Sequence, residues 1–391
     1  MSLPLVGLPA AMQDPFRFDS PHQKLIARIV NHKLWRDSLD EAWNPAHRTS
    51  AASARRLNLG GLLEEVNRWF EPAVLARLLG EPSTETERLA QQWLAEGGKR
   101  WRPFLTVALY QALLDEPLPF CQLTDDLRRV AISLECFHKA SLIHDDIEDD
   151  DAERYGTQTM HERHGVPVAL NLGDFLIGEG YRLLAESDVP PHRRAEMLRL
   201  AAAGHRSLSI GQGEELLWTH VSKPLSPEEV MVIFRGKTAP AFSTALHIGA
   251  VLGGADKAMH ATLDAFSDAL GVAYQIRDDL DDLQAAREAG EAPEARPTIP
   301  WAIAYQTADK PQRTVIAQAW VHGGDAEEIY RLLDELEIPD RSAELYRAYR
   351  DEALLALYGL DNANVKNLLR RVLSKIFNEP DLVPSSPTRN F

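Results

Sequence analysis

A helical repeat of apolar residues dominates this sequence and constrains its fold more than any other feature. From about Leu57 onward, apolar side chains recur at three- and four-residue spacing, which gathers them on one face of an α-helix. Alternating runs of β-branched residues, the pattern of a half-buried strand, hardly occur. Helices that each carry an apolar stripe bury it against one another, so we predict an all-α fold.

The sequence divides into three segments of different pattern. Residues 1–56 mix Pro, His, Trp and isolated charges, with one short amphipathic stretch over residues 23–35, and are interpreted as an N-terminal extension of unknown role. Residues 57–377 hold the helical pattern and are expected to form one domain. Residues 378–391, rich in Pro, Ser and Asn, are expected to be a disordered tail.

Local signals punctuate the helical pattern. The sequence Ser-Pro-Glu-Glu at 226–229 predicts a helix start with a capping hydroxyl, proline in the first turn and an acid three residues after the cap. Pro240 lies inside the helix begun there, so a kink is expected between residues 237 and 241. Residues 287–300 are rich in Gly, Pro, Ala and Glu and are expected to form a mobile loop that closes over a site.

Composition and charge exclude several classes of protein. The formal net charge of -16 comes from 58 acidic against 42 basic side chains, so the overall field repels nucleic acid and anionic membranes. An anionic substrate therefore requires a local basic pocket. Only two cysteines, Cys121 and Cys136, are present and no CxxC pattern occurs, so we expect reduced thiols, with Cys136 in a helix core. Without a signal peptide or a membrane-length apolar run, we expect a cytoplasmic protein.

The first aspartate cluster carries the densest chemical signal. It reads HDDIEDDD from His144 and follows a helix expected to start near Asp125. Asp145 and Asp149 lie one helical turn apart with Asp146 beside them, and such like charges weaken a helix unless a cation binds. The cluster lacks the Gly and Glu positions of an EF-hand, so Mg²⁺ held by carboxylates and substrate phosphates suits it better.

A second aspartate cluster repeats the arrangement. It reads QIRDDLDD from Gln275, in a helix expected to begin near Asp256, and again places Asp278 and Asp282 one turn apart with Asp279 adjacent. One such cluster is usually a solvated face, whereas two DDxxD motifs that each follow an apolar helix favour function. Facing helices that carry them would hold metal ions bridging a diphosphate. Since no P-loop, GxGxxG or nucleophile motif occurs, metal-assisted loss of diphosphate is the chemistry that remains.

A basic segment supplies the cations that an acidic protein needs for diphosphates. It reads GGKRWRP from Gly97 to Pro103. The glycines permit close backbone approach, and Pro103 suits a first helical turn. Because helix N-termini also attract anions, this segment is a candidate diphosphate site.

These motifs together resemble a known family. The matches are GGKRWRP at Gly97, ECFHKASLIHDDIED at Glu135, LGDFL at Leu172, GQGEE at Gly211, GKT at Gly236 and YQIRDDLDD at Tyr274. Their order, over residues 57–374, resembles the trans-isoprenyl diphosphate synthases of the polyprenyl synthetase family. The resemblance implies an isoprenoid-synthase-type helical bundle with a deep central cavity, usually a homodimer, that works with Mg²⁺.

The resemblance also implies a reaction and its residues. A prenyltransferase of this kind ionises an allylic prenyl diphosphate to diphosphate and an allylic carbocation, which the double bond of isopentenyl diphosphate attacks. Loss of a proton, for which the released diphosphate is the expected base, then gives a longer trans-prenyl diphosphate. The metal-binding sets are Asp145, Asp146 and Asp149, and Asp278, Asp279 and Asp282. The isopentenyl diphosphate site is Lys99, Arg102 and His138, and the allylic site is Arg154, Lys237, Thr238 and Gln275. The catalytic residues among them are Asp145, Asp146, Asp149, Lys237 and Asp278.

Two departures from the family pattern keep alternatives open. Tyr155 stands where the family has a second arginine that helps to bind isopentenyl diphosphate, and residues 287–300 lack the family's loop lysine, offering Arg287 and Arg296 instead. A terpene synthase or cyclase on the same fold, or a non-catalytic regulatory subunit of a prenyl synthase, are therefore the competing hypotheses. The isopentenyl-site matches argue against the first, and the complete acidic clusters against the second.

Product length is read from the bulk of side chains just before the first cluster, as the resemblance implies. Ala140 and Ser141 are small there, and Phe137 one turn earlier is large. We therefore expect a product of about geranylgeranyl length, with farnesyl and longer products still open.

Overall fold

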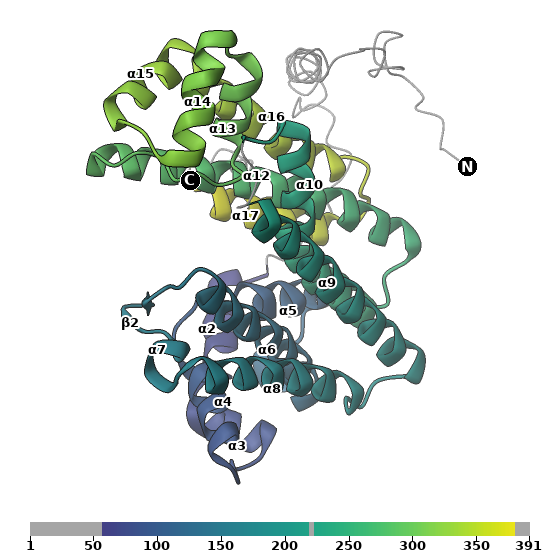
Figure 1. Cartoon of the computed structure of the whole chain (residues 1–391). Coiled ribbons are helices and arrows are strands. Elements are labelled where there is room, and N and C mark those ends of the chain that lie inside the picture. The colour runs from purple at the N-terminus through teal and green to yellow at the C-terminus, as the bar shows by residue number, and fades with distance from the viewer. Residues whose placement is uncertain (1–56, 219–222, 380–391) are drawn as a thin grey trace, which may run out of the picture. The chain divides into compact units, whose positions relative to one another are not determined.

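The computed structural model of the chain describes residues 57–218 and 223–379 (Figure 1). The predicted N-terminal extension, with its short helix, and nearly all of the predicted tail lie outside the described residues. Helices account for most of the described chain, whose strands are limited to β1 (Glu153–Arg154) and β2 (Thr157–Gln158). The prediction of an all-α fold is confirmed.

The described residues divide into two compact units, named here by the aspartate cluster that each contains. The first-cluster unit comprises residues 57–207, 240–265 and 359–379, and the second-cluster unit comprises 208–239 and 266–358. Helices α9 (Pro191–Trp218) and α12 (Lys257–Ala289) each contribute several residues to both units. The expected single domain over 57–377 stays a prediction.

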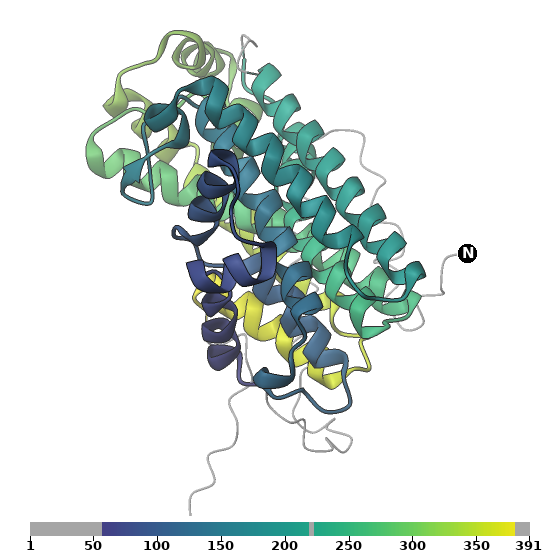
Figure 2. The same cartoon turned by 90° about the horizontal axis from the view of Figure 1, so that it is seen from below.

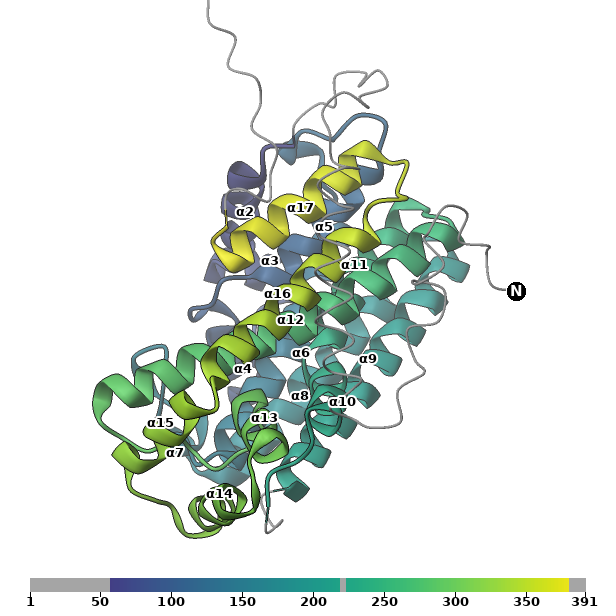
Figure 3. The same cartoon turned by 90° about the horizontal axis from the view of Figure 1, so that it is seen from above.

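The first-cluster unit is organised around one helix pair. Besides its shares of α9 and α12, this unit contains α2 (Leu59–Arg68), α3 (Pro72–Leu79), α4 (Glu85–Ala95), α5 (Trp101–Leu113), the 3₁₀ helix η3 (Phe120–Gln122), α6 (Asp125–Glu148), α7 (Met160–His164), α8 (Val166–Ala185), α11 (Ala239–Gly253) and α17 (Ala363–Phe377). Helix α6 packs along α8 and also contacts α3, α4, α5 and α7. Figure 3 shows α17 beside α5, which it contacts.

Helix α6 is buried because apolar residues surround it on several sides. Val130, Leu134 and Ile143 are almost fully covered, and Cys136 is buried among them as predicted, whereas Cys121 on η3 is exposed. Burial of such side chains contributes about 1.5–3 kcal/mol each. The helix can therefore carry costly acidic residues at its C-terminal end.

The second-cluster unit is built from shorter helices. Besides its shares of α9 and α12 it contains α10 (Pro227–Lys237), α13 (Ile299–Thr307), α14 (Lys310–His322), α15 (Ala326–Glu335) and α16 (Ile338–Ala356). Helix α13 contacts α10, α14 and α16, and α15 contacts α14 and α16. In Figures 2 and 3 the helices α13 to α15 form a compact green group.

Several local predictions can be compared with the helix boundaries. Ser226 caps α10 with its side chain, and Glu229 completes the capping box as predicted. Near Pro240 the structure has a boundary rather than a kink within one helix, since α10 ends at Lys237 and α11 begins at Ala239. No helix in the described part of the chain is both long enough and apolar enough to cross a bilayer.

Candidate functional site

The first aspartate cluster forms the C-terminal end of α6. Asp145 is half-buried, Asp149 is exposed and Asp146 is fully buried. Arg154, on the β1–β2 hairpin, donates from Nε to Asp146 and from Nη2 to Asp151 at 3.3 Å. Burial raises the pKa of Asp146 although Arg154 opposes this. The structure thus joins two predicted site residues, Asp146 and Arg154, in one ion pair.

Four buried polar atoms of α6 have no hydrogen-bond partner among the described residues. They are Oδ2 of Asp146, Nε2 of His144, Nδ1 of His138 and Oε2 of Glu135. Buried polar atoms are nearly always satisfied, so this side of α6 suits a polar ligand or a cation. Burial and the nearby charge of Arg102 hold the pKa of His138 well below its usual value. Its imidazole is therefore neutral at pH 7.

The segment between α4 and α5 is anchored by an arginine that the sequence interpretation did not single out. Arg100 is buried and has a left-handed backbone with a φ of 51°. It donates to Glu135 at 2.5 Å and to the carbonyl of Leu94 at 2.6 Å, and its guanidinium lies 4.2 Å from the centre of the Phe70 ring. The neighbouring predicted cations differ, since Lys99 is exposed and Arg102 is half-buried.

The second aspartate cluster lies in α12 and has the same order of exposure, with Asp278 half-buried, Asp279 buried and Asp282 exposed. Asp279 accepts a hydrogen bond at 2.8 Å from the backbone N–H of Ile299, and burial raises its pKa to about 8. Burial and the adjacent Asp282 raise the pKa of Asp278 to about 6. Arg296, from the predicted mobile loop, contacts the exposed Asp282. The Asp279 carboxyl holds its proton at neutral pH and would release it on binding a cation.

The other predicted residues of this unit lie in two contacts. Thr238 Oγ1 donates to Gln275 Oε1 at 3.0 Å, one helical turn before the aspartates. Lys237 Nζ lies 2.6 Å from Glu215 of α9. Arg287, which lies in the last turn of α12 rather than in the predicted loop, pairs with Asp334 at 2.6 Å.

Glycines explain why two of the recognised motifs need their sequence. A Cβ atom on Gly211 of α9 would overlap the backbone of Gly236 and Lys237 on α10, so the helices touch there. A Cβ atom on Gly173 of α8 would meet the ring of His144 on α6. The GQGEE motif therefore holds α9 close to α10 at Lys237, and the LGDFL motif holds α8 close to α6 at His144.

The aspartates do not form a complete metal cage by themselves. Within residues 57–218 and 223–379, no three His, Cys, Asp or Glu side chains are arranged to hold a metal ion. Each cluster offers carboxylates on successive turns of one helix, which suits a few-ligand Mg²⁺ site that also uses substrate phosphates. Both metal-binding sets, and the expectation that the clusters face each other, stay predictions.

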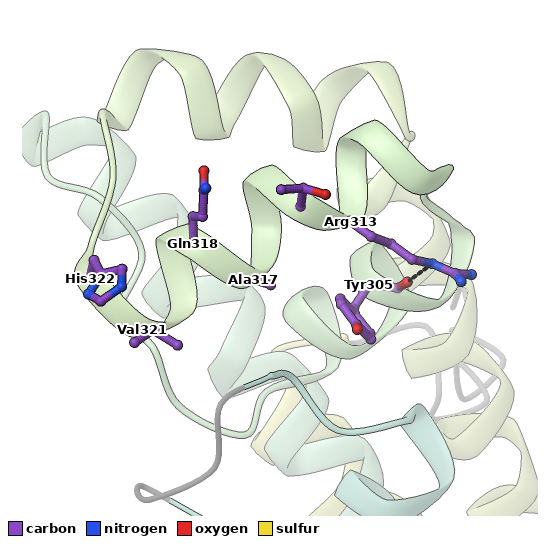
Figure 4. Close-up of a pocket in the computed structure, with 7 residues that line it drawn as sticks. Tyr305, Arg313, Ala317, Gln318, Val321 and His322 are labelled. Carbon is purple, nitrogen blue, oxygen red and sulfur yellow. Dashed lines mark hydrogen bonds between the residues drawn. The ribbon is translucent and has the colours of Figure 1, made fainter.

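A surface pocket lies on α13 and α14, away from every predicted site residue in the sequence. Figure 4 shows Tyr305, Arg313 and His322 around it, and Arg313 Nε donates to the Tyr305 carbonyl at 3.0 Å. Its lining contains no carboxylate. This pocket therefore does not supply the metal-binding chemistry.

Fold and clusters together define an all-α protein with an aspartate-rich helix segment and an arginine partner in each of two units. Comparison with known proteins narrows this class. Residues 83–336 match the family model described as polyprenyl synthetase. The chain belongs to the polyprenyl synthetase family.

Individual relatives agree with this assignment. The chain is 37% identical over 205 residues to farnesyl diphosphate synthase of Geobacillus stearothermophilus, covering 50% of this chain and 65% of that protein. It is 30% identical over 207 residues to geranylgeranyl pyrophosphate synthase of Geoglobus acetivorans, covering 52% and 61%. These matches span less than two thirds of the curated relatives' own length.

The fold similarity extends further than the sequence similarity. The crystal structure of geranylgeranyl pyrophosphate synthetase from Pyrococcus horikoshii Ot3 matches with a TM-score of 0.70 at 25% identity, covering 81% of this chain and 97% of that one. This similarity supports the prediction of an isoprenoid-synthase-type helical bundle.

Proposed function

We propose that this chain is a trans-prenyltransferase that joins an allylic prenyl diphosphate to isopentenyl diphosphate. One observation carries the proposal: two DDxxD segments end or interrupt long buried helices, and each is contacted by an arginine from a neighbouring loop or hairpin. Buried carboxylates with unpaired or protonated oxygens suit divalent cations better than structural ion pairs.

Mg²⁺ is the cation that we propose. It would be held by Asp145, Asp146 and Asp149 and by Asp278, Asp279 and Asp282, and would neutralise charge on the departing diphosphate. The oxygen-only donor set fits a hard cation, and the unpaired Oδ2 of Asp146 offers it a ligand.

The chain's own residues would bind and orient the two substrates. Lys237, Arg154, Thr238 and Gln275 are proposed for the allylic diphosphate, and Lys99, Arg102 and His138 for isopentenyl diphosphate. Lys99 and Arg102 supply fixed positive charge at the N-terminus of α5, where helix N–H groups also favour anions. The neutral imidazole of His138 can donate one N–H hydrogen bond to the diphosphate.

Product length is proposed to be limited by an aromatic group of three residues. Phe137 on α6 packs edge-on against Tyr181 on α8 with ring centres 4.9 Å apart, and Tyr181 OH lies 3.3 Å from His205 Nδ1 on α9. Gly180 is tightly apposed to the Phe137 ring, which fixes its position. With Ala140 one turn nearer the cluster, an alkyl chain meets its first bulky side chain at Phe137, in agreement with a geranylgeranyl product.

We further propose a cytoplasmic homodimer. Val166 and Leu170 of α8 are four residues apart, share a helix face and are largely exposed, which suits burial against a second copy. Sedimentation or light scattering of the purified chain measures the mass directly, and a monomer at micromolar concentration would contradict the dimer.

The decisive experiment is incubation of purified protein with Mg²⁺, isopentenyl diphosphate and each short allylic diphosphate, followed by mass spectrometry of the products. Elongated diphosphates are expected, with chains of about geranylgeranyl length. Phe137→Ala should lengthen them, whereas Phe242→Ala, on another helix, should not.

A second candidate function is a terpene synthase or cyclase, which Tyr155 favours because it removes an isopentenyl-site arginine. A hydrocarbon or alcohol formed without isopentenyl diphosphate would establish it. Turnover in no combination would point to the regulatory-subunit hypothesis.

A further inference from the structure

A fully buried lysine, Lys139 of α6, contacts the segment that joins α4 to α5. Its Nζ is 4.0 Å from the centre of the Trp93 ring and 4.8 Å from that of Tyr155, and it donates to the Glu96 carbonyl at 2.7 Å. Trp93 Nε1 donates in turn to the Lys139 carbonyl at 3.0 Å. An ammonium between two aromatic faces is stabilised by cation–π attraction.

Tyr155 is held in place by the residues around Lys139. It occupies the first central position of the β1–β2 turn with a φ of 55°, which is rare for a large side chain, and Gly156 follows with a φ of 76°. A Cβ atom on Gly97 would lie 3.2 Å from the Tyr155 ring. The ring therefore covers the start of the segment that carries Lys99.

Charges on every element around Lys139 define its electrostatic setting. Glu135 and Glu96 attract its ammonium, whereas Arg100 and Arg154 repel it. Arg100 is already paired with Glu135 at 2.5 Å, and Arg154 with Asp146. Lys139 therefore adds a positive charge that, among the residues the structure describes, no carboxylate within 4.0 Å neutralises.

We propose that Lys139 is a positioning residue for isopentenyl diphosphate. It acts on the site through its contacts with Tyr155 and the Glu96–Gly98 backbone. Its buried positive charge substitutes for the guanidinium that is missing because position 155 is a tyrosine. The inference rests on the proposed function, because it names the residue that lets the same site bind its substrate. Tyr155 and Lys139 act as a pair, in which the aromatic ring fixes the segment and the lysine supplies the charge.

The protonation of Lys139 should then control anion binding. Burial, with repulsion from Arg100, lowers the pKa of Lys139 to about 7. A diphosphate bound nearby favours the charged form, so it binds more tightly when Lys139 is protonated. The affinity should therefore fall as the pH rises through about 7.

The test is calorimetric titration with isopentenyl diphosphate at about pH 6, 7 and 8.5, without Mg²⁺ or allylic substrate. Lys139→Met should weaken binding about tenfold at pH 6 and flatten the decline between pH 7 and 8.5. Lys139→Arg keeps its charge at every pH and should bind well at pH 8.5. Lys257→Met, which removes an exposed lysine of the same unit, is the matched control.

Two further measurements separate a functional effect from a folding defect. The melting temperature of Lys139→Met should equal or exceed that of the parent protein, since a buried charge is replaced by an apolar side chain of similar size. The double variant Lys139→Met/Tyr155→Arg returns the charge at position 155 and should recover most of the affinity. Parental affinity and pH dependence in Lys139→Met would overturn the proposal.

Inorganic pyrophosphate distinguishes this inference from the proposed function. If pyrophosphate binding depends on Lys139 but isopentenyl diphosphate is never condensed, the anion site stands and the prenyltransferase reaction fails. If condensation proceeds and the KM for isopentenyl diphosphate is unchanged in Lys139→Met, the reaction stands and the role of Lys139 fails.

Discussion

The two aspartate clusters share a sequence pattern but differ in how their charge is held. In the first cluster the buried Asp146 is paired with Arg154 from the β1–β2 hairpin. In the second cluster the buried Asp279 accepts a backbone N–H bond, and Arg296 instead contacts the exposed Asp282. Spacing along a helix therefore sets which carboxylates are neighbours, whereas elements distant in sequence set which of them are ionised.

The two clusters therefore differ in the charge state of their buried carboxyl groups before a ligand binds. The first has an arginine counter-charge at its buried carboxylate before any ligand arrives. The second keeps its buried carboxyl protonated at neutral pH, because burial outweighs the influence of Arg296. A divalent cation would displace that proton on binding.

The largest expected effect is on turnover, and it should be the same in both clusters. Asp145→Ala and Asp278→Ala should each lower the condensation rate by about 10³-fold or more, because each removes a proposed ligand to the ions that stabilise the leaving group. Product formation measured by mass spectrometry checks this, with circular dichroism to show an intact helical fold. Asp281→Ala, an exposed neighbour, is the control, and parental rates in either cluster variant would contradict the metal assignment.

Removing the arginine of each cluster should lower the free energy of unfolding by different amounts. The side chains of Arg154 and Asp146 are 24% and 1% exposed, whereas those of Arg296 and Asp282 are 36% and 61% exposed. Arg154→Met leaves a buried carboxylate unpaired and should lower the free energy of unfolding by about 2–4 kcal/mol. Arg296→Met should cost less than about 1 kcal/mol. Urea titrations measure both, and equal losses would show that burial does not distinguish the clusters.

The two glycines at close helix contacts predict a smaller difference. Gly211→Ala sets a methyl group against the backbone of Gly236 and Lys237, which cannot move away, so we expect a loss of about 1–3 kcal/mol. Gly173→Ala meets only the His144 ring, which can rotate, and should cost less. Thermal unfolding of the two variants tests the order, and the reverse order would mean that α6 and α8 are the more tightly constrained pair.

The smallest expected effect concerns pH in the metal-free protein. Unfolded aspartates ionise near pH 4, whereas folded Asp279 ionises near pH 8, so the folded state binds more protons between these values. Stability should therefore fall as the pH rises from about 5 to 8. Asp279→Asn should flatten this decline, which thermal unfolding at about pH 5 and pH 8 would measure. An unchanged pH profile in Asp279→Asn would place the protonated group elsewhere.

Lys139 should show the opposite trend in the first-cluster unit. Its folded pKa of about 7 lies below the usual lysine value of 10.5, so the unfolded state binds more protons above pH 7. The cost of burying its charge should decrease as the pH rises from about 7 toward 10.

Helical periodicity was sufficient to predict the all-α fold and the placement of both clusters. The helices expected near Asp125 and Asp256 begin at Asp125 and Lys257, because long apolar stripes and capping residues are local signals. The partners of the site residues were not predictable in this way. Arg100 reads in the sequence as one of three cations in a basic segment, yet it is buried against Glu135, which lies on a different helix.

Lys139 was missed for the same physical reason. Its two aromatic neighbours come from positions 93 and 155, and neither spacing matches a helical or strand period. In sequence it is one charged residue between His138 and Ala140, with no signal that it is buried. Only the packing of α4 and the hairpin against α6 shows that Tyr155 and Lys139 belong together.

The contrast between the two cysteines offers a route to observing this chain at work. Cys121 is exposed on η3, whereas Cys136 is enclosed in α6, where burial raises the pKa of its thiol well above the usual value. Thiolate is the reactive form, so a maleimide dye should attach at a single position without any engineered mutation. Fluorescence from that dye would report ligand-induced changes in the first-cluster unit of the otherwise unmodified protein.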